Sequence, residues 1–585
     1  MVGDFPRACD SCRGARYQPA RRRLAGRTRP EDVIFDSSGG LQTEDVICSR
    51  QIGERNRMFD IVIRNGLIVD GAGSPSFEAD IAIKDGRIAT VGSNLGGGKK
   101  EIDASGQVVA PGFIDIHSHS DFTVLVDPLC SSKIRQGITT ELNGNCGWSA
   151  APLRGEGTNW IQEKVRQLGL PTEFPWDDVK GYLGALEESR PAMNMGILVG
   201  FGNLRVGAMG YDARPATGNE IGQMQADLRS GLADGAFGLS SGLYFSPESA
   251  AEASEVTAVA SVLPEFGGLY TAHIRDEGAQ SVGLLAAVDE AIAVGVEAGV
   301  PVQLSHLKAL GPKAWGLAGA VLQRMDEARA NGVDVAGDQY PYTETGGNLH
   351  SALVPKWALE GGRAGLTKRL EDPSDRRRIR DAVTELFPLR GGPSRLMVRA
   401  CAFDRSLQGR TLSEIADDWK IAPEEVVLKM LAHENVKLIS MALNEDDVET
   451  FMKHPNVMMS SDGMVLADTG VLSAVHTHPR TYGAFPRVLA EYVRKRSVLT
   501  LENAIYKMTG LPARRLGLEG RGELQEGNWA DVVILSPDDV QDLATLQRPH
   551  VYPRGIQHVI VNGGIAVENG APTSARTGQV LRHAA

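Results

Sequence analysis

Short runs of alternating apolar and polar residues mark both ends of the chain and predict β-strands. They are residues 59–63, 66–69, 80–83, 88–91, 530–535 and 559–563. Asn65-Gly66 and Asp85-Gly86 stand between neighbouring runs and predict hairpin turns. Neither end has enough strands to close a core alone. The pattern therefore predicts one split β-sandwich domain made from residues 58–110 and 510–575.

Between these ends, short apolar runs alternate with segments of helical spacing, which indicates βα units and a parallel sheet. Helical spacing is clearest over 220–233, 281–298 and 317–330. Eight βα units predict a (β/α)8 TIM-like barrel over 111–509, with its active site where the strands end. The eight runs are 113–116, 138–142, 196–200, 237–239, 270–273, 301–305, 333–337 and 456–460.

The interval between the seventh and eighth predicted strands is too long for a loop. Residues 343–455 are therefore predicted to form an inserted α+β subdomain, with a helical stretch from 412 to 433.

The charge balance excludes some partners. The chain has 585 residues, with 61 basic against 73 acidic side chains and a net charge of −12, which makes nucleic acid an unfavourable partner. No apolar run approaches the roughly 18 residues that span a bilayer, so no membrane partner is expected. Six cysteines in so long a chain do not form a disulfide framework, which favours a reducing, cytoplasmic location. The oligomeric state is left open.

Residues 1–57 differ from the rest, with eleven arginines, no lysine and eight acids. They lack the apolar segment of a secretory signal. Cys9 and Cys12 form a single CxxC without a second pair of ligands nearby. We expect a disordered tail or a mis-chosen start codon, and we assign this segment no function.

Metal-binding side chains gather at or just after the ends of the predicted strands. In isolation each has a simpler explanation: an HxH pair can arise by chance, a single histidine can be a hydrogen-bonded core residue, a cysteine can pack as a small apolar group, and an aspartate can sit in a turn. Their joint occurrence at one face of one barrel predicts a metal centre. The six residues are His117, His119, Cys146, His273, His306 and Asp462.

Imidazole, thiolate and carboxylate ligands together favour Zn²⁺ over Mg²⁺ or Ca²⁺, which prefer oxygen. Six ligands exceed the four of one tetrahedral site. Either one metal uses a subset, or two metals share a bridge, for which the Cys146 thiolate is the natural candidate.

Several motifs recur in the order typical of a known family. The sequence resembles the D-aminoacylase (N-acyl-D-amino-acid deacylase) family of the amidohydrolase superfamily over roughly residues 58–570. The segments that carry the resemblance are Pro111-Gly112-Phe113-Ile114-Asp115-Ile116-His117-Ser118-His119, Asn143-Gly144-Asn145-Cys146-Gly147, His273-Ile274-Arg275-Asp276-Glu277, Ser305-His306-Leu307-Lys308, Asp338-Gln339-Tyr340-Pro341-Tyr342, Ser461-Asp462-Gly463 and His478-Pro479-Arg480-Thr481-Tyr482-Gly483.

The resemblance implies one tightly bound zinc on Cys146, His273 and His306. A weaker second site would take His117 and His119 and share Cys146 and Asp462. It also implies a small-molecule N-acyl-D-amino acid as substrate, whose α-carboxylate would meet Lys308, Tyr340 and Arg480. For these three residues a structural ion pair or core packing is the alternative explanation.

Chemistry suggests a role for Asp462. Zinc lowers the pKa of a bound water and polarises a carbonyl, so an activated water can attack the amide. Asp462 would accept the proton of that water and deliver it to the departing nitrogen. Pure metal ligation is the rival role.

Two departures from the family pattern concern substrate recognition. After Tyr342, relatives usually carry a small hydroxyl residue before the insertion, whereas residues 343–348 read Thr-Glu-Thr-Gly-Gly-Asn. Phe245 stands where relatives commonly carry tyrosine. Two other functions remain as alternatives, a cyclic amidase resembling hydantoinases or dihydroorotases and a non-catalytic barrel scaffold. The absence of a bridging lysine opposes the first, and the complete ligand set opposes the second.

Overall fold

The computed structural model describes residues 58–433 and 436–583. The predictions made for residues 1–57, including those for Cys9 and Cys12, lie outside the described residues.

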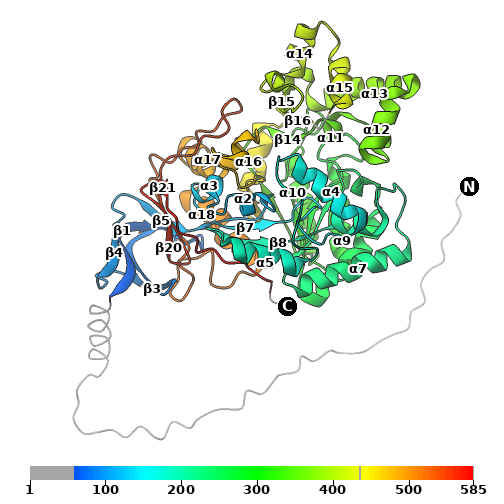
Figure 1. The fold of residues 1–585 in the computed structure, drawn as a ribbon. Coiled ribbons are helices and arrows are strands. Elements are labelled where there is room, and N and C mark those ends of the chain that lie inside the picture. Colours follow the sequence, from blue (N-terminus) through cyan, green and yellow to red (C-terminus); the bar gives the residue numbers. More distant parts are fainter. Residues whose placement is uncertain (1–57, 434–435, 584–585) are drawn as a thin grey trace, which may run out of the picture. The chain divides into compact units, whose positions relative to one another are not determined.

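The two ends of the described chain build one nine-stranded sheet, in the order β21-β20-β19-β18-β5-β1-β2-β3 with β4 beside β1 (Figure 1). β18 pairs antiparallel with β5, so strands more than 400 residues apart in sequence are neighbours. This confirms a β-sandwich domain formed by both chain ends. Its strands are β1 (Phe59–Ile68), β2 (Phe77–Lys84), β3 (Arg87–Gly92), β4 (Gly98–Asp103), β5 (Val108–Pro111), β18 (Val532–Leu535), β19 (Ile556–Val561), β20 (Gly564–Glu568) and β21 (Ala571–Pro572).

The hairpin predicted at Asn65-Gly66 is wrong. Phe59–Ile68 is one strand, and its pairing with β2 shifts register between Ile63 and Gly66. Asn65 has a φ of 57°, and its backbone N–H donates to Asp80 Oδ1 at 2.9 Å. The left-handed residue therefore forms a β-bulge inside the strand. By contrast, Asp85-Gly86 does connect β2 to β3.

The eight predicted barrel strands are present in the predicted order. One sheet has the order β17-β13-β12-β11-β10-β9 and another the order β6-β7-β8. Only Leu198 separates β8 from β9, and a parallel bridge between Ser118 and Gly463 joins the two sheets at the other side. The strands are β6 (Phe113–Asp115), β7 (Ile138–Asn143), β8 (Asn194–Ile197), β9 (Val199–Gly200), β10 (Gly238–Gly242), β11 (Leu269–His273), β12 (Val302–Leu304), β13 (Val335–Gln339) and β17 (Val457–Met459).

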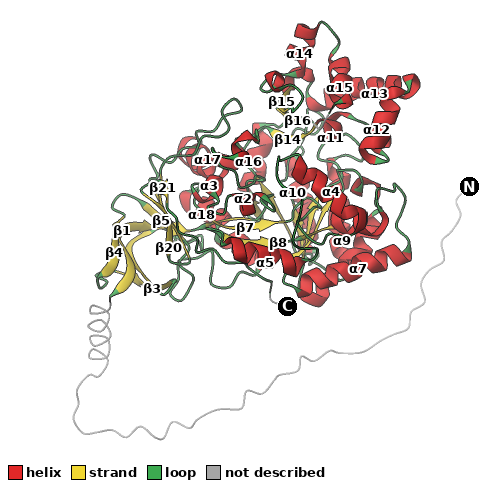
Figure 2. Ribbon diagram, viewed as in Figure 1, coloured by secondary structure: helices red, strands yellow, loops and turns green. Residues whose placement is uncertain are grey.

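Helices separate these strands along the chain (Figure 2). The three predicted helices correspond to α7, α9 and α10. No helix in the described ranges is long and apolar enough to cross a membrane. The helices are α2 (Thr123–Val126), α3 (Ser131–Ile134), α4 (Gly155–Arg166), α5 (Val179–Ser189), α6 (Phe201–Met209), α7 (Gly218–Ala233), α8 (Ala253–Ala260), α9 (Leu284–Ala298), α10 (Ala318–Ala330), α16 (Glu445–Lys453), α17 (Arg480–Arg487), α18 (Leu501–Met508) and α19 (Gly510–Leu516).

The segment between β13 and β17 carries its own three-stranded antiparallel sheet, in the order β14-β16-β15. Buried apolar residues from Leu349 to Leu438 form a separate hydrophobic cluster, whereas Val448 and Phe451 of α16 belong to the main one. The elements are β14 (Thr345–Asn348), α11 (Leu349–Leu353), α12 (Gly362–Glu371), α13 (Pro373–Leu386), β15 (Leu396–Ala400), α14 (Leu412–Trp419), α15 (Pro423–Ala432) and β16 (Lys437–Ser440).

Candidate metal centre

All six predicted ligands come together at the carboxyl ends of the barrel strands. His117 and His119 follow β6, Cys146 follows β7, and His273 is the last residue of β11. The remaining two, His306 and Asp462, follow β12 and β17. Because the strands of a barrel run parallel, their ends meet at one mouth although the residues are far apart in sequence.

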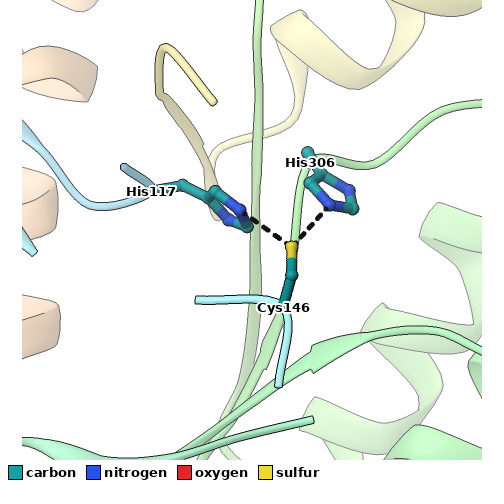
Figure 3. Close-up of side chains that lie close together, drawn as sticks. All are labelled: His117, Cys146 and His306. Carbon is teal, nitrogen blue, oxygen red and sulfur yellow. Dashed lines mark hydrogen bonds between the residues drawn. The ribbon is translucent and has the colours of Figure 1, made fainter. Parts of the chain in front are cut away.

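Cys146 lies at the centre of the cluster. Its Sγ is 3.3 Å from His117 Nε2, 3.2 Å from His306 Nε2 and 3.4 Å from His273 Nδ1. Figure 3 shows the first two imidazoles pointing at the sulfur from opposite sides. One thiol thus faces three imidazole nitrogens, as a bridging ligand would.

A second group shares His117. His119 Nε2 is 3.3 Å from Asp462 Oδ1, and His117 Nε2 is 4.0 Å from the same oxygen. The ring of Trp148 stacks on His119, with centroids 5.3 Å apart and planes within 4°. Three overlapping groups of potential ligands therefore lie at this mouth: His117, Cys146 and His306; His117, His119 and Asp462; and His273, Glu277 and His306.

Three of these residues have left-handed backbones. The φ angles are 56° for Cys146, 35° for His306 and 45° for Asp462. Non-glycine residues rarely adopt positive φ, and such strain is concentrated at functional sites. The chain therefore turns sharply at three ligand positions, directly after or close to the ends of their strands.

The donor set fits zinc in both atom type and protonation state. Burial lowers the pKa of His119 and His306, and it brings the pKa of His273 to about 4. These three imidazoles are therefore neutral near pH 7, which is the form that binds metals. Burial also raises the pKa of the Cys146 thiol, so a cation would have to displace its proton.

Two carboxylates that we did not predict lie beside the outer nitrogens of the histidines. Glu277 Oε1 lies 3.4 Å from His273 Nε2 and 3.3 Å from His306 Nδ1, the nitrogens that do not face Cys146. Asp338 Oδ1 lies 3.5 Å from His117 Nδ1 in the same way. His117 Nδ1 and His273 Nε2 have no hydrogen-bond partner among the described residues, so these acids stand where carboxylates that orient metal-binding histidines lie. Both acids stand within motifs that also carry a predicted site residue, and this position in the sequence could have identified them.

Asp462 is ionised. Burial opposes its charge, but Arg480 and His119 outweigh that effect and hold the pKa of the carboxyl well below its usual range. Arg480 Nη1 lies 2.9 Å from Asp462 Oδ2. The carboxylate can therefore accept a proton at neutral pH.

The three predicted substrate contacts also border this cluster. Lys308 is ion-paired with Glu277, and its Nζ is 2.8 Å from His306 Nδ1. The guanidinium of Arg480 lies 4.5 Å from the ring centre of Tyr340, and Lys308 Nζ lies 5.6 Å from it. No described residue bonds the buried Tyr340 hydroxyl. The two cations thus flank the ring of Tyr340 beside the candidate ligands.

Comparison with known proteins places the chain in a defined group. Residues 100–353 and 415–567 match the amidohydrolase family, and residues 29–109 match the N-terminal domain of the urease alpha-subunit. The chain is 38% identical to an N-acyl-D-glutamate deacylase of Alcaligenes xylosoxydans xylosoxydans over 525 residues, which is 89% of this chain and 96% of the relative.

Two solved structures resemble the fold over 90% of this chain and 100% of their own. One is N-acyl-D-glutamate deacylase from Bordetella bronchiseptica, complexed with zinc and a phosphonate inhibitor that mimics the tetrahedral intermediate, at 36% identity and a TM-score of 0.75. The other is a D-aminoacylase with a binuclear metal center, at 32% identity and a TM-score of 0.76. In that protein one metal is associated with activation and the second with attenuation.

Proposed function

Because the chain belongs to the N-acyl-D-amino-acid deacylase family of metal-dependent amidohydrolases, we propose that it hydrolyses the amide bond of an N-acyl-D-amino acid. The products are a carboxylate and the free D-amino acid. The observation that carries this proposal is the convergence of three histidine nitrogens on Cys146 Sγ at the mouth of the barrel.

We assign a tightly held zinc to Cys146, His273 and His306. A weaker site takes His117 and His119 and shares Cys146 and Asp462. When bound, zinc supplies Lewis acidity that lowers the pKa of water and polarises a carbonyl. The potential-ligand groups overlap at His117 and His306, which supports two neighbouring sites, as does the binuclear center of the D-aminoacylase relative.

In this proposal Asp462 first accepts a proton from the attacking water and then delivers it to the amide nitrogen. An amine leaves only after protonation, so one carboxylate serves as base and then as acid. Its ionised state supports the first step. Its Oδ1 faces His119 and its Oδ2 faces Arg480, so the carboxylate is held from both sides.

Lys308, Tyr340 and Arg480 bind the α-carboxylate of the substrate. Arg480 offers a planar fork and Lys308 a compact charge, and the free hydroxyl of Tyr340 is a third donor. In the structure described here Arg480 pairs with Asp462. A substrate carboxylate would share that guanidinium and would bring the amide toward Asp462.

We assign the domains as predicted. Residues 58–110 and 510–575 form the sandwich, and 111–509 form the barrel with the α+β insertion 343–455. The separate cluster from Leu349 to Leu438 supports an inserted unit, whereas α16 near the end of this range packs into the main cluster.

The test is a panel of N-acetyl and N-formyl amino acids in both enantiomers, assayed for free amine with and without a chelator. We expect release of amine from D-substrates and loss of activity on zinc removal. Hydrolysis confined to L-substrates would overturn the stereochemical assignment. Activity only on hydantoins or dihydroorotate, measured in parallel by ring opening, would overturn the linear-amide assignment.

A further inference from the structure

A small cavity of about 50 Å³ joins the candidate metal centre to the segment between β13 and β17. His273 and Asp462 line it from the barrel, and β14 together with Ser440 of β16 lines it from that segment. Arg390, at the end of a short 3-10 helix after α13, also lines the cavity. This space is the natural place for the part of a substrate beyond its scissile amide.

Arg390 forms no direct ion pair with a described residue, although its charge acts on Glu277, which lines the same cavity. It is only 5% exposed. Its Nη2 donates to Gln280 Oε1 at 3.0 Å and to the hydroxyl of Tyr244, and both of these acceptors are neutral. No carboxylate oxygen of the described residues lies within 4.0 Å of the Arg390 guanidinium, which is the distance limit for an ion pair. A buried unpaired guanidinium is costly, because desolvation weakens its charged state without a compensating attraction.

The other two cations of the cavity region differ in this respect. Lys308 is paired with Glu277, and Arg480 with Asp462. A substrate α-carboxylate would therefore join existing pairs. Arg390 instead bonds only the neutral side chains of Tyr244 and Gln280. The Tyr244 hydroxyl accepts its hydrogen bond, and the centre of the Tyr244 ring lies 5.4 Å from that of His273, a candidate metal ligand.

Further unbalanced cations lie on the sheet that faces the site. Arg399 of β15 and Lys437 of β16 have no ion-pair partner among the described residues. Burial lowers the pKa of Arg399 to about 10 and that of Lys437 to about 7, so Arg399 stays charged at neutral pH whereas Lys437 is only partly charged. Arg399 approaches Gly346, which lines the cavity. In a chain of net charge −12, this local excess of positive charge points to an anionic ligand.

We infer that the cavity selects an N-acyl amino acid that carries a second carboxylate, and that Arg390 is the specificity-determining residue that binds it. This inference rests on the proposed function. A guanidinium pairs with a carboxylate through two parallel hydrogen bonds, so it separates an acid from its uncharged amide of equal size. The second carboxylate belongs either to the amino-acid side chain or to the acyl group, and the substrates below distinguish the two.

The first experiment compares kcat/KM of the zinc-loaded enzyme for matched pairs. N-acetyl-D-glutamate is set against N-acetyl-D-glutamine, and N-acetyl-D-aspartate against N-acetyl-D-asparagine. N-succinyl-D-leucine against N-acetyl-D-leucine reports a carboxylate on the acyl group. We expect at least one acid to exceed its neutral partner by roughly 10- to 100-fold. Equal values in all three pairs overturn the inference and leave the deacylase assignment intact.

The second experiment uses Arg390→Met, which keeps most of the side-chain length and removes the charge. The preferred acid should lose roughly 10- to 100-fold in kcat/KM, while its neutral partner changes less than threefold. Retained hydrolysis of the neutral substrate shows that the variant is folded. Arg395→Met is the matched control, because Arg395 lies in the same segment but bonds the carbonyl of Met441. An unchanged acid preference in Arg390→Met overturns the inference.

Binding without turnover separates this inference from the proposed function. Calorimetry compares glutarate with its monoamide on the native zinc-loaded enzyme and on Arg390→Met. Tighter binding of glutarate that disappears in the variant supports the charge recognition even if none of the N-acyl compounds is hydrolysed. Equal affinity for both ligands in the native enzyme overturns it.

Discussion

At the scale of single residues, Asp462 is the group whose proposed role is most specific. Asp462→Ala should retain the tightly bound zinc and lose roughly 10²- to 10⁴-fold in kcat, because a positioned acid–base group contributes that much. Zinc content by atomic absorption and steady-state kinetics check this. Asp468→Ala, which changes an exposed carboxylate six positions later, should leave both values unchanged. Near-native kcat in Asp462→Ala would restrict Asp462 to metal ligation.

Cys146 distinguishes this centre from one held by oxygen and nitrogen alone. Cys146→Ser replaces a soft thiolate with a hard, weakly acidic hydroxyl, so zinc affinity should fall by roughly 100-fold or more. Competition with a chromogenic chelator measures the affinity. Cys130→Ser is the matched control, since Cys130 is also free and buried but lies outside the cluster. Equal affinity in the two variants would remove Cys146 from the ligand set.

Glu248 is a buried carboxyl group near the loop of Cys146. Its Oε2 accepts the backbone N–H of Gly242 at 2.7 Å, and burial raises its pKa from 4.5 to about 8. The folded state thus holds a proton that the unfolded state releases. The stability that this group contributes is present below pH 4.5 and is lost as the pH rises through 8.

Glu248→Gln should therefore become more stable relative to the native chain as the pH increases from 4.5 to 8, by about 3 to 5 kcal/mol. Urea unfolding of both zinc-free proteins at several pH values gives this difference. Because only the difference is used, other titrating groups cancel. A difference that does not change with pH would show that Glu248 is ionised in the fold.

The limits of sequence reasoning are clearest for single residues. The six ligands could be predicted to meet because each follows a strand and the barrel brings strand ends together. Glu277 and Asp338 were passed over because their role depends on which imidazole nitrogen they face. Arg390 has no strand or motif to mark it, and only its burial without a direct ion pair distinguishes it.

At the scale of elements, a buried ion network holds α3 against the strands that carry ligands. Lys133 Nζ donates to Asp115 Oδ2 at 2.8 Å and to Ser461 Oγ at 2.8 Å, and it is paired with Glu141. Lys133 and the two acids are essentially unexposed. The network thus ties β6, β7 and the residue before Asp462 to one helix.

Lys133→Met should lower the free energy of unfolding by about 3 to 5 kcal/mol, because it leaves two carboxylates buried without their cation. Lys84→Met is the control: Lys84 pairs with Asp60 at 3.1 Å but is 39% exposed, so its loss should cost about 1 kcal/mol or less. Denaturant unfolding measures both. Equal losses in the two variants would mean that the network adds no stability beyond a surface pair.

The two Asx-Gly pairs show why element boundaries escaped prediction. Asn65-Gly66 and Asp85-Gly86 carry the same local turn signal. The difference arises from distant partners, since Asn65 Nδ2 bonds Asp103 at 3.1 Å and the strand continues against β2 and β4. A local pattern cannot report pairing with strands that come later in the chain.

At the scale of the whole molecule, the last described residues lie against the barrel. Met195 N donates to Gln579 O at 2.9 Å, Leu581 N donates to Met195 O at 2.7 Å, and Gln579 N donates to Asn194 Oδ1 at 3.0 Å. The chain thus crosses from the sandwich back to β8. Sequence patterns predicted the barrel and the sandwich, but they gave no sign of this contact, because residues 575–583 have no strand periodicity.

A chain ending at Ser574 should unfold at a lower urea concentration than the full chain, because β8 loses these backbone hydrogen bonds. Their net contribution is about 0.5 to 1.5 kcal/mol each. Urea titration followed by circular dichroism tests this, with zinc content measured on the same samples. An unchanged midpoint would show that the segment adds no stability to the barrel.

The left-handed turns at Cys146, His306 and Asp462 have a consequence for metal exchange. Their conformational penalty is met when the barrel folds, so zinc meets donors that are already in place. We therefore expect uptake to be limited by diffusion and thiol deprotonation, and repeated chelation and reloading to restore full occupancy without denaturant. The same rigidity disfavours β-branched replacements at these three positions, whatever their affinity for metal.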